Sequence, residues 1–140
     1  MSTEQNITLA REYLEKAWNE KDLSVVDRLI AHDHVSHGPY TEGLPPGPEG
    51  ERAFISTFIN AFPDVRMTID SIEASGDVVH ASVTYRGTHT GELMGISPTG
   101  KTTVVTVKTT SRIVNGQIVE SGAEWDPNEM LRQLGVAAGR

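Results

Sequence analysis

Residues 86–101, RGTHTGELMGISPTGK, and residues 111–135, SRIVNGQIVESGAEWDPNEMLRQLG, decide the fold of this chain. The pair Asn115-Gly116 is a strong type I′ hairpin signal, so the β-branched run before it should fold back onto the strand QIVESGAEW. Asp126 stands where this last strand gives way to a helix predicted over residues 127–134, which ends at Gly135. The stretch therefore predicts a hairpin, a closing helix and one acid at their junction.

Alternation of period two extends the sheet upstream of this hairpin. Val65, Met67 and Ile69 share one face of a strand, and the odd positions from Val79 to Tyr85 share one face of the next. A turn at residues 75–77 joins the two, and a glycine-punctuated hairpin over 87–100 leads to the third strand. These runs predict an antiparallel sheet.

The same alternation indicates which polar side chains face the interior. Continuing the odd positions through Gly87 places His89 on the buried side, and Thr109 and Ser111 follow the buried valines of the third strand. In the last strand the apolar pattern is ambiguous. Asp126 shares its parity with Ile118, Glu120, Gly122 and Glu124, whereas Val119 and Ala123 lie on the other side.

The first 62 residues are predicted to be helical apart from one loop. Ser2 and Gln5 form a capping box for an amphipathic helix in which Tyr13 and Trp18 belong to the core, with polar tips that can reach a ligand. Asp22 can cap a short second helix. Residues 31–50, rich in Gly, Pro and His, predict an irregular loop, and a third helix spans Glu49 to Phe62, with Ala53 among its buried residues.

Helices followed by an antiparallel sheet and a closing helix predict the α+β class, with a curved sheet wrapped around the N-terminal helices. The length of 140 residues suits one domain over 1–140. With 19 acidic and 12 basic residues the net charge is −7, which disfavours nucleic acid and membrane as partners. Cysteine is absent, so no disulfide or thiolate chemistry is available, and the N-terminus has no signal-peptide pattern, so we expect the cytoplasm.

Asp126 has two interpretations. Asp126-Pro127-Asn128-Glu129 is a complete helix-start signature, and a capping carboxylate that accepts backbone N–H bonds is a poor base. The alternative is a proton carrier that faces a dry cavity, where burial raises the pKa of a carboxyl group. The local pattern favours capping, and a cap at a cavity wall combines both roles.

The histidines of the predicted loop suggest a metal site only weakly. His32, His34 and His37 have a spacing on an irregular segment that matches no standard ligand pattern. We expect His37 at the rim of a pocket and His80 in solvent. His89 is either a structural residue of its turn or a substrate contact.

Taken together, the motifs resemble one known family. LPPGPEG, AFPDV, GDVV, RGTHTGELMGISPTGK, RIVNGQIVE and WDPNEMLRQLG resemble the SnoaL-like polyketide cyclases, or ester cyclases, of the NTF2-like superfamily. The likeness covers the chain from the first helix to Gly135. It implies a cone-shaped α+β barrel with one deep pocket, and a homodimer or higher homo-oligomer that pairs through the exposed sheet face.

The resemblance also implies a reaction. An Asp at the position of Asp126 is the acid/base catalyst of an intramolecular aldol ring closure of a polyketide ester, which uses no metal or organic cofactor. The hydrophobic, polyketide-like substrate would be oriented by a set of polar and aromatic side chains: His37, His89, Thr109, Ser111, Glu120, Tyr13 and Trp18.

One departure from the family pattern concerns the pocket wall. Many relatives carry Trp four residues before the acid, whereas this chain has Gly122, from which we expect a larger or differently shaped cavity. Two rival functions remain open: hydrolysis, hydroxylation or isomerisation of a small apolar molecule in the same pocket, and a non-catalytic ligand-binding module in which Asp126 is only a cap.

Overall fold

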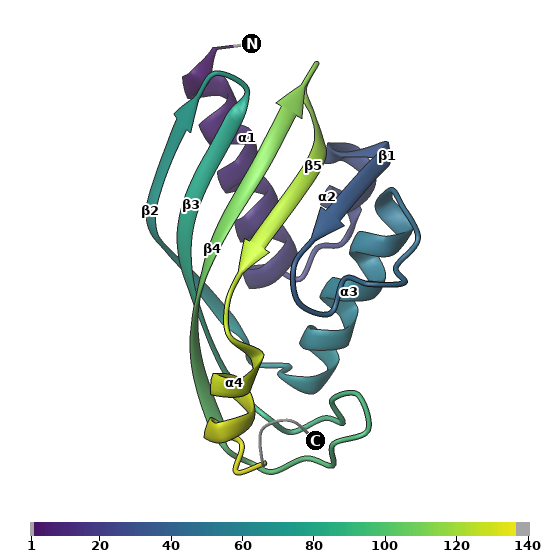
Figure 1. Ribbon diagram of the computed structural model, residues 1–140, viewed down its shortest axis with the longest axis vertical. Coiled ribbons are helices and arrows are strands. Elements are labelled where there is room, and N and C mark those ends of the chain that lie inside the picture. Colours follow the sequence, from purple (N-terminus) through teal and green to yellow (C-terminus); the bar gives the residue numbers. More distant parts are fainter. Residues whose placement is uncertain (1, 137–140) are drawn as a thin grey trace.

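The computed structural model describes residues 2–136, in which helices pack on one face of a curved five-stranded sheet (Figure 1). The N-terminal half contains α1 (Thr3–Leu14), a π-helical turn η1 (Glu15–Asn19), α2 (Ser24–Leu29), β1 (Ile30–His37) and α3 (Pro48–Ala61). The rest contains β2 (Arg66–Ser75), β3 (Val78–Thr88), β4 (Thr102–Val114), β5 (Gln117–Glu124) and α4 (Pro127–Gln133). The predicted α+β architecture is confirmed.

The sheet has the strand order β1-β5-β4-β3-β2. The neighbours from β2 to β5 pair antiparallel, as the alternation predicted, and β1 pairs parallel with β5 at the edge. Asn115 and Gly116 have φ values of 52° and 76°, which is the left-handed conformation that a type I′ turn requires. The turn therefore determines the register of the β4–β5 hairpin.

The predicted capping box of the first helix is confirmed, and the predicted cap of the second helix lies one residue before the N-cap position. The Gln5 amide donates to Oγ of Ser2 at 3.1 Å while the Ser2 amide donates to Oε1 of Gln5 at 2.9 Å, so the capping box is complete. The N-cap residue of α2 is Leu23, and Asp22 lies one residue before it. Oδ1 of Asp22 nevertheless accepts a hydrogen bond from the Ser24 amide at the start of the helix.

The prediction of a loop over residues 31–50 is wrong for its first part, because residues 30–37 form β1. Only Ile30, Ala31 and His34 are buried in this strand, so no apolar alternation marks it. Its inward positions His34 and Ser36 are polar, and its pairing partner β5 lies more than 80 residues away. In α3 the burial of Ala53 is also wrong, since it is exposed, and Ile55 is buried instead.

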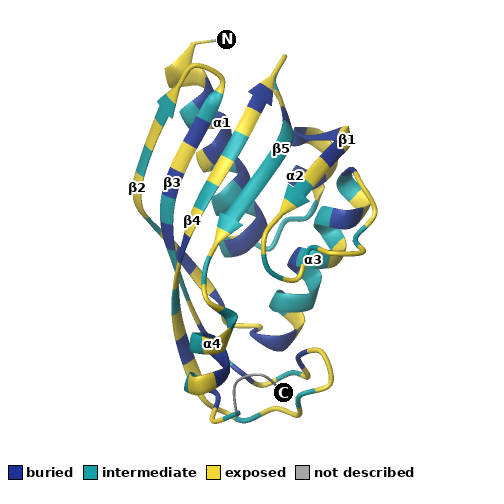
Figure 2. Ribbon diagram, viewed as in Figure 1, coloured by how far each residue is buried: buried dark blue, intermediate teal, exposed yellow. Residues whose placement is uncertain are grey.

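Burial follows strand parity over most of the sheet (Figure 2). Val83, Val107 and Met67 face the helices, and β2 carries a bulge between Ile69 and Ser71 that shifts its register against β3. The opposite face of the sheet carries mostly exposed polar residues, including Thr106, Lys108 and Thr110. No helix within residues 2–136 is long and apolar enough to cross a membrane.

Candidate functional site

An apolar pocket of about 120 Å³ lies between α3 and the inward face of β3, β4 and β5. Strand parity brings every second residue of β4 to its wall, and α3 contributes one aromatic side chain per turn. α4 contributes Met130 at one end. The lining residues are Trp18, Phe54, Phe58, Phe62, Val65, Tyr85, Thr103, Val105, Val107, Thr109, Ala123, Trp125 and Met130. Such a wall selects an apolar ligand.

Three hydroxyl groups interrupt this apolar wall. They belong to Tyr85 on β3 and to Thr103 and Thr109 on β4. Burial, followed by the negative charge of Glu51, raises the pKa of Tyr85, so its phenol stays protonated and can donate a hydrogen bond. The Tyr85 ring packs edge-on against Trp18 at a centroid distance of 4.9 Å. The pocket therefore offers donors to a ligand oxygen.

An aromatic cluster borders the pocket on the side of the β1–α3 connection. The rings of Phe58 and Trp125 line the pocket, and Tyr40 packs against both, with centroid distances of 6.2 Å to Phe58 and 5.7 Å to Trp125. Tyr40 is exposed and has a φ of 64°, an uncommon value for a residue other than glycine. The sequence analysis did not identify this cluster, because its members come from three separate elements.

Asp126 is the N-cap of α4. Its Oδ1 accepts a 2.9 Å hydrogen bond from the Asn128 amide, and the residue is exposed. It does not line the apolar pocket, although Trp125 and Met130, on either side of it in the chain, do. The cap interpretation therefore describes its observed geometry, and the position at a dry cavity wall that the catalytic interpretation requires is not the one observed.

The other predicted site residues are divided between three environments. Trp18 and Thr109 line the pocket as expected. Ser111 is half-buried on the inward face but does not line the pocket, and Tyr13 is buried, hydrogen-bonded to Glu51 and also outside the lining of the pocket. His37 and Glu120 are a hydrogen-bonded pair at 2.8 Å with largely exposed side chains, and Arg112 lies 3.6 Å from Glu120.

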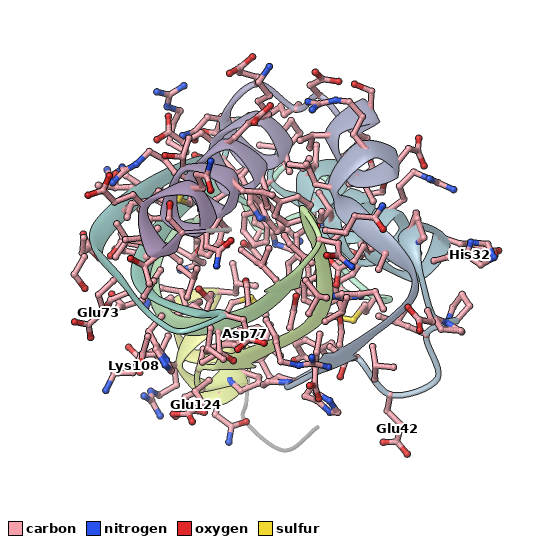
Figure 3. The ribbon with its side chains drawn as sticks, turned by 90° about the horizontal axis from the view of Figure 1, so that it is seen from above. His32, Glu42, Glu73, Asp77, Lys108 and Glu124 are labelled. Carbon is pink, nitrogen blue, oxygen red and sulfur yellow. The ribbon has the colours of Figure 1, made fainter. Side chains whose placement is uncertain are left out.

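Gly122 also faces away from the apolar pocket. A Cβ built on it would meet Oγ1 of Thr110, an exposed side chain, at 2.8 Å. The expectation that its missing side chain enlarges the ligand cavity is wrong, because β5 turns position 122 outward and position 123 inward. Gly122 instead borders a polar hollow of about 550 Å³ on the outer face. In Figure 3, Glu73, Lys108 and Glu124 of this hollow point away from the sheet.

His89 has a structural role. It is fully buried, and its Nδ1 accepts from the Thr99 amide at 3.2 Å, while its backbone pairs with Gly100 and Lys101. This arrangement closes the 89–100 loop, and the ring packs on Phe62 at 5.4 Å. Nε2 has no hydrogen-bond partner among the described residues. His89 is outside the set of residues that line the apolar pocket.

A buried polar cluster that the sequence analysis missed lies beneath β1. Oε2 of Glu51 accepts from the Tyr13 hydroxyl at 2.9 Å, and Oε1 accepts from Oγ of Ser36. Nε2 of His34 lies 2.8 Å from Oγ of Ser121, and Nδ1 lies 4.0 Å from Oε1 of Glu51. The alternation of β1 could have indicated that 34 and 36 share a face, but a polar strand gives no sign of burial.

The described residues contain no group of three or more His, Cys, Asp or Glu side chains arranged to hold a metal ion. Burial lowers the pKa of His34, an effect that the charges of Glu51 and Glu120 oppose. The hydrogen bond from His37 is the main cause that lowers the pKa of Glu120. His32, His34 and His37 do not form such a group within residues 2–136.

Comparison with known proteins gives one family. The sequence model described as SnoaL-like polyketide cyclase matches residues 8–134. A search of the curated proteins finds no significant match. Among solved structures, TsrD from Streptomyces laurentii is similar over 96% of this chain and 98% of its own, with 26% identity and a TM-score of 0.85.

Two further solved structures share more of the sequence. AclR, a proposed hydroxylase from Streptomyces galilaeus, is 30% identical over 96% of this chain and 83% of its own, with a TM-score of 0.82. IdmH, a proposed polyketide cyclase from Streptomyces antibioticus, is 39% identical over 89% of this chain and 95% of its own, with a TM-score of 0.74. These matches span most of this chain.

Proposed function

Because this chain belongs to the SnoaL-like polyketide cyclase family, we propose that it closes a ring in a polyketide-like substrate bound in the apolar pocket. The observation that carries the proposal is the pocket itself: aromatic and aliphatic walls with three hydroxyls from Tyr85, Thr103 and Thr109. Such a wall suits a flat, mainly apolar molecule that carries a few oxygens.

The size of the pocket suggests how the substrate lies. A cavity of about 120 Å³ is similar to one that holds a single benzene ring. A larger substrate therefore extends beyond it, unless side chains such as Phe58 move. Trp125 and Met130 line the pocket on either side of Asp126 in the chain, so a substrate that projects at this end lies close to the start of α4.

The proposed reaction is an intramolecular aldol addition that closes a ring. A base removes a proton from a carbon between two carbonyl groups, and the C–H electron pair becomes the enolate. The enolate carbon attacks a second carbonyl carbon, a C–C bond forms, and the carbonyl π pair becomes an alkoxide. The alkoxide takes back one proton, so the product is an isomer of the substrate. Tyr85 and Thr109 are suited to donate hydrogen bonds to the oxygens on which charge develops.

Asp126 is the proton carrier that the family resemblance assigns, and this role remains a hypothesis. Its exposed carboxylate can serve only a reacting end that projects from the pocket. Asp126→Asn tests the role, because asparagine caps a helix as well as aspartate does but cannot accept the proton. With aromatic polyketide β-keto methyl esters as substrates, loss of ring closure with unchanged thermal stability supports the role. Full turnover by the variant removes Asp126 from the mechanism.

The use of the pocket is tested separately by a pair of substitutions on β4. Val107→Phe places a ring in the pocket. Thr106→Phe, at the preceding position of β4, places the same ring on the outer face of the sheet. We expect Val107→Phe to abolish binding and turnover of the esters, and Thr106→Phe to retain both. Equal activity in the two variants would mean that the substrate binds elsewhere.

A second candidate function is ligand binding without catalysis. Two observations favour it. None of the residues that line the apolar pocket carries a carboxylate, and the Asp126 carboxylate is engaged as a helix cap. In that case the esters bind and are recovered unchanged, and Val107→Phe still abolishes binding.

The same incubation also detects hydroxylation, because a product that incorporates labelled oxygen from dioxygen gains mass while a cyclised product does not.

A further inference from the structure

A third cavity, of about 200 Å³, lies beneath the connection between β1 and α3. β1 contributes His34 and Ser36 to its wall, α3 contributes Glu51, and the connection contributes apolar groups and one hydroxyl. Its members include His34, Ser36, Thr41, Leu44, Pro45 and Glu51. None of these residues lines the apolar pocket of the proposed ring closure, so the cavity is a separate feature.

His34 carries an unused acceptor at this cavity. Its side chain is only 2% exposed, and Nε2 is engaged with Oγ of Ser121 at 2.8 Å. Nδ1 makes no hydrogen bond to any residue between 2 and 136, and its distance of 4.0 Å from Oε1 of Glu51 is too long for one. When Nε2–H donates to Ser121, the lone pair of Nδ1 is available to a donor in the cavity.

Glu51 supplies a second acceptor whose position is held. The Tyr13 hydroxyl donates to Oε2 and the Ser36 hydroxyl donates to Oε1, so the carboxylate is fixed from two elements. Each carboxylate oxygen can accept more than one hydrogen bond, which leaves Oε1 able to accept another. The Glu51 side chain is only 13% exposed.

The charges around the cavity select a cation. No Lys or Arg is among its lining residues, and the carboxylates of Glu51, Glu120 and Asp33 act on His34 with the same sign. His37, which opposes them, is bonded to Glu120, and Arg112 lies beside the same carboxylate. Arg52, next to Glu51 in sequence, forms an ion pair with Asp27 on the exposed side of α3. Burial lowers the pKa of His34 and keeps its ring neutral.

We propose that this cavity binds a small primary alkylammonium ion that bridges Oε1 of Glu51 and Nδ1 of His34. A nitrogen about 2.8 Å from each of two atoms 4.0 Å apart makes an angle of about 90° with them, close to the angle between two ammonium N–H bonds. Leu44 and Pro45 provide apolar surface for a short alkyl chain. An anion would meet only acceptors and negative charge at the two polar atoms.

The probe is propylammonium chloride, titrated into the full chain at constant ionic strength and followed by amide NMR shifts. We expect saturable shifts that map to β1 and the start of α3. Glu51→Gln should weaken the affinity by about tenfold or more, because a charge-assisted bond is lost. Glu49→Gln, an exposed acid two residues earlier that does not line the cavity, should leave it unchanged.

Three outcomes of the titration would overturn the proposal. If Glu51→Gln binds propylammonium as tightly as wild type does, or if 1-propanol causes equal shifts, the charge interaction with Glu51 is not needed for binding. If sodium propionate causes equal shifts, the cavity does not select a cation. A wild-type readout covers the case in which Glu51→Gln does not fold. In protein labelled at its five histidines, propylammonium should shift Nδ1 of His34 and leave exposed His32 and His80 unaffected. An unmoved His34 signal also overturns the proposal.

Discussion

The hydroxyl of Tyr13, near the end of α1, donates a 2.9 Å hydrogen bond to Oε2 of Glu51 in the first turn of α3. The two residues are 38 positions apart, Tyr13 is buried, and the Glu51 side chain is only 13% exposed. Burial, then the charge of Glu51, raises the pKa of the Tyr13 phenol well above its usual value. Burial and this contact together keep the phenol protonated, and the contact fixes the position of the carboxylate.

Tyr13→Phe removes the donor from this contact and leaves Oε2 of Glu51 with one partner fewer in a poorly hydrated site. We expect a loss of about 1–2 kcal/mol in the free energy of unfolding, measured by urea denaturation. Tyr40→Phe is the matched control, because Tyr40 is exposed and its hydroxyl forms no hydrogen bond with any residue from 2 to 136. Equal losses in the two variants would contradict a specific role for the Tyr13–Glu51 bond.

High pH should reveal the buried phenols. Folding raises the pKa of Tyr13 and Tyr85 above the ordinary value of 10.0, so their contribution to stability is complete below pH 10 and declines as the pH rises above it. Absorbance of phenolate should therefore develop at higher pH in the folded chain than in denaturant. In Tyr13→Phe the displaced part of this signal should be smaller, and an unchanged titration curve would contradict the assignment.

Low pH should destabilise the chain through His34. Burial places its folded pKa below the ordinary 6.5, so the unfolded chain binds the proton more readily and stability declines as the pH falls from 6.5 through the folded value. NMR titration of the five histidines measures this directly. The His34 resonances should titrate below the ordinary pKa of 6.5, and a His34 pKa above that value would contradict the structure.

Asp126→Ala should cost about 1 kcal/mol in the free energy of unfolding, because the Asn128 amide loses its acceptor at the start of α4. Asp126→Asn should change it by only a few tenths of a kcal/mol, since asparagine is an equally good cap. Thermal or urea unfolding of the two variants gives the comparison. Identical stability of Asp126→Ala and wild type would show that the cap contributes nothing.

Adjacent positions on β5 should respond oppositely to tryptophan. Ala123→Trp fills the apolar pocket and should abolish binding of the aromatic ester probes, whereas Gly122→Trp puts its ring on the outer face beside Thr110 and should leave affinity within about twofold. Isothermal titration with one ester measures both. Loss of binding in Gly122→Trp alone would mean that position 122, and not position 123, faces the pocket.

The oligomeric state follows from the family resemblance and stays a prediction. Pairing through the outer sheet face would bury polar residues such as Thr106, Lys108 and Thr110, and such an interface would be wet and hydrogen-bonded. Sedimentation should give a dimer mass. Thr110→Glu, placed at the centre of that face, should reduce dimerisation if the face is used, and a monomer for wild type would end the prediction.

Much of the fold could be predicted because its signals are local. The Ser2–Gln5 capping box, the Asn115-Gly116 turn and the Asp126-Pro127 helix start each act within four residues, and all three appear as expected. Strand parity likewise placed Thr109 on the pocket wall. β1 was missed because its inward side chains are polar, and a pattern of hydrophobicity cannot distinguish a buried His34 from a solvated one.

By itself the sequence determined the order and period of the elements, the hairpin register and, through its motifs, the family, since these depend on neighbours a few positions apart. Only the tertiary structure decided that Asp126 does not line the apolar pocket, that Gly122 lies outside it, and that Glu51 lies near His34. His34 and Ser121 are 87 residues apart. Contacts of that separation arise from strand pairing and helix packing, whose geometry no local pattern carries.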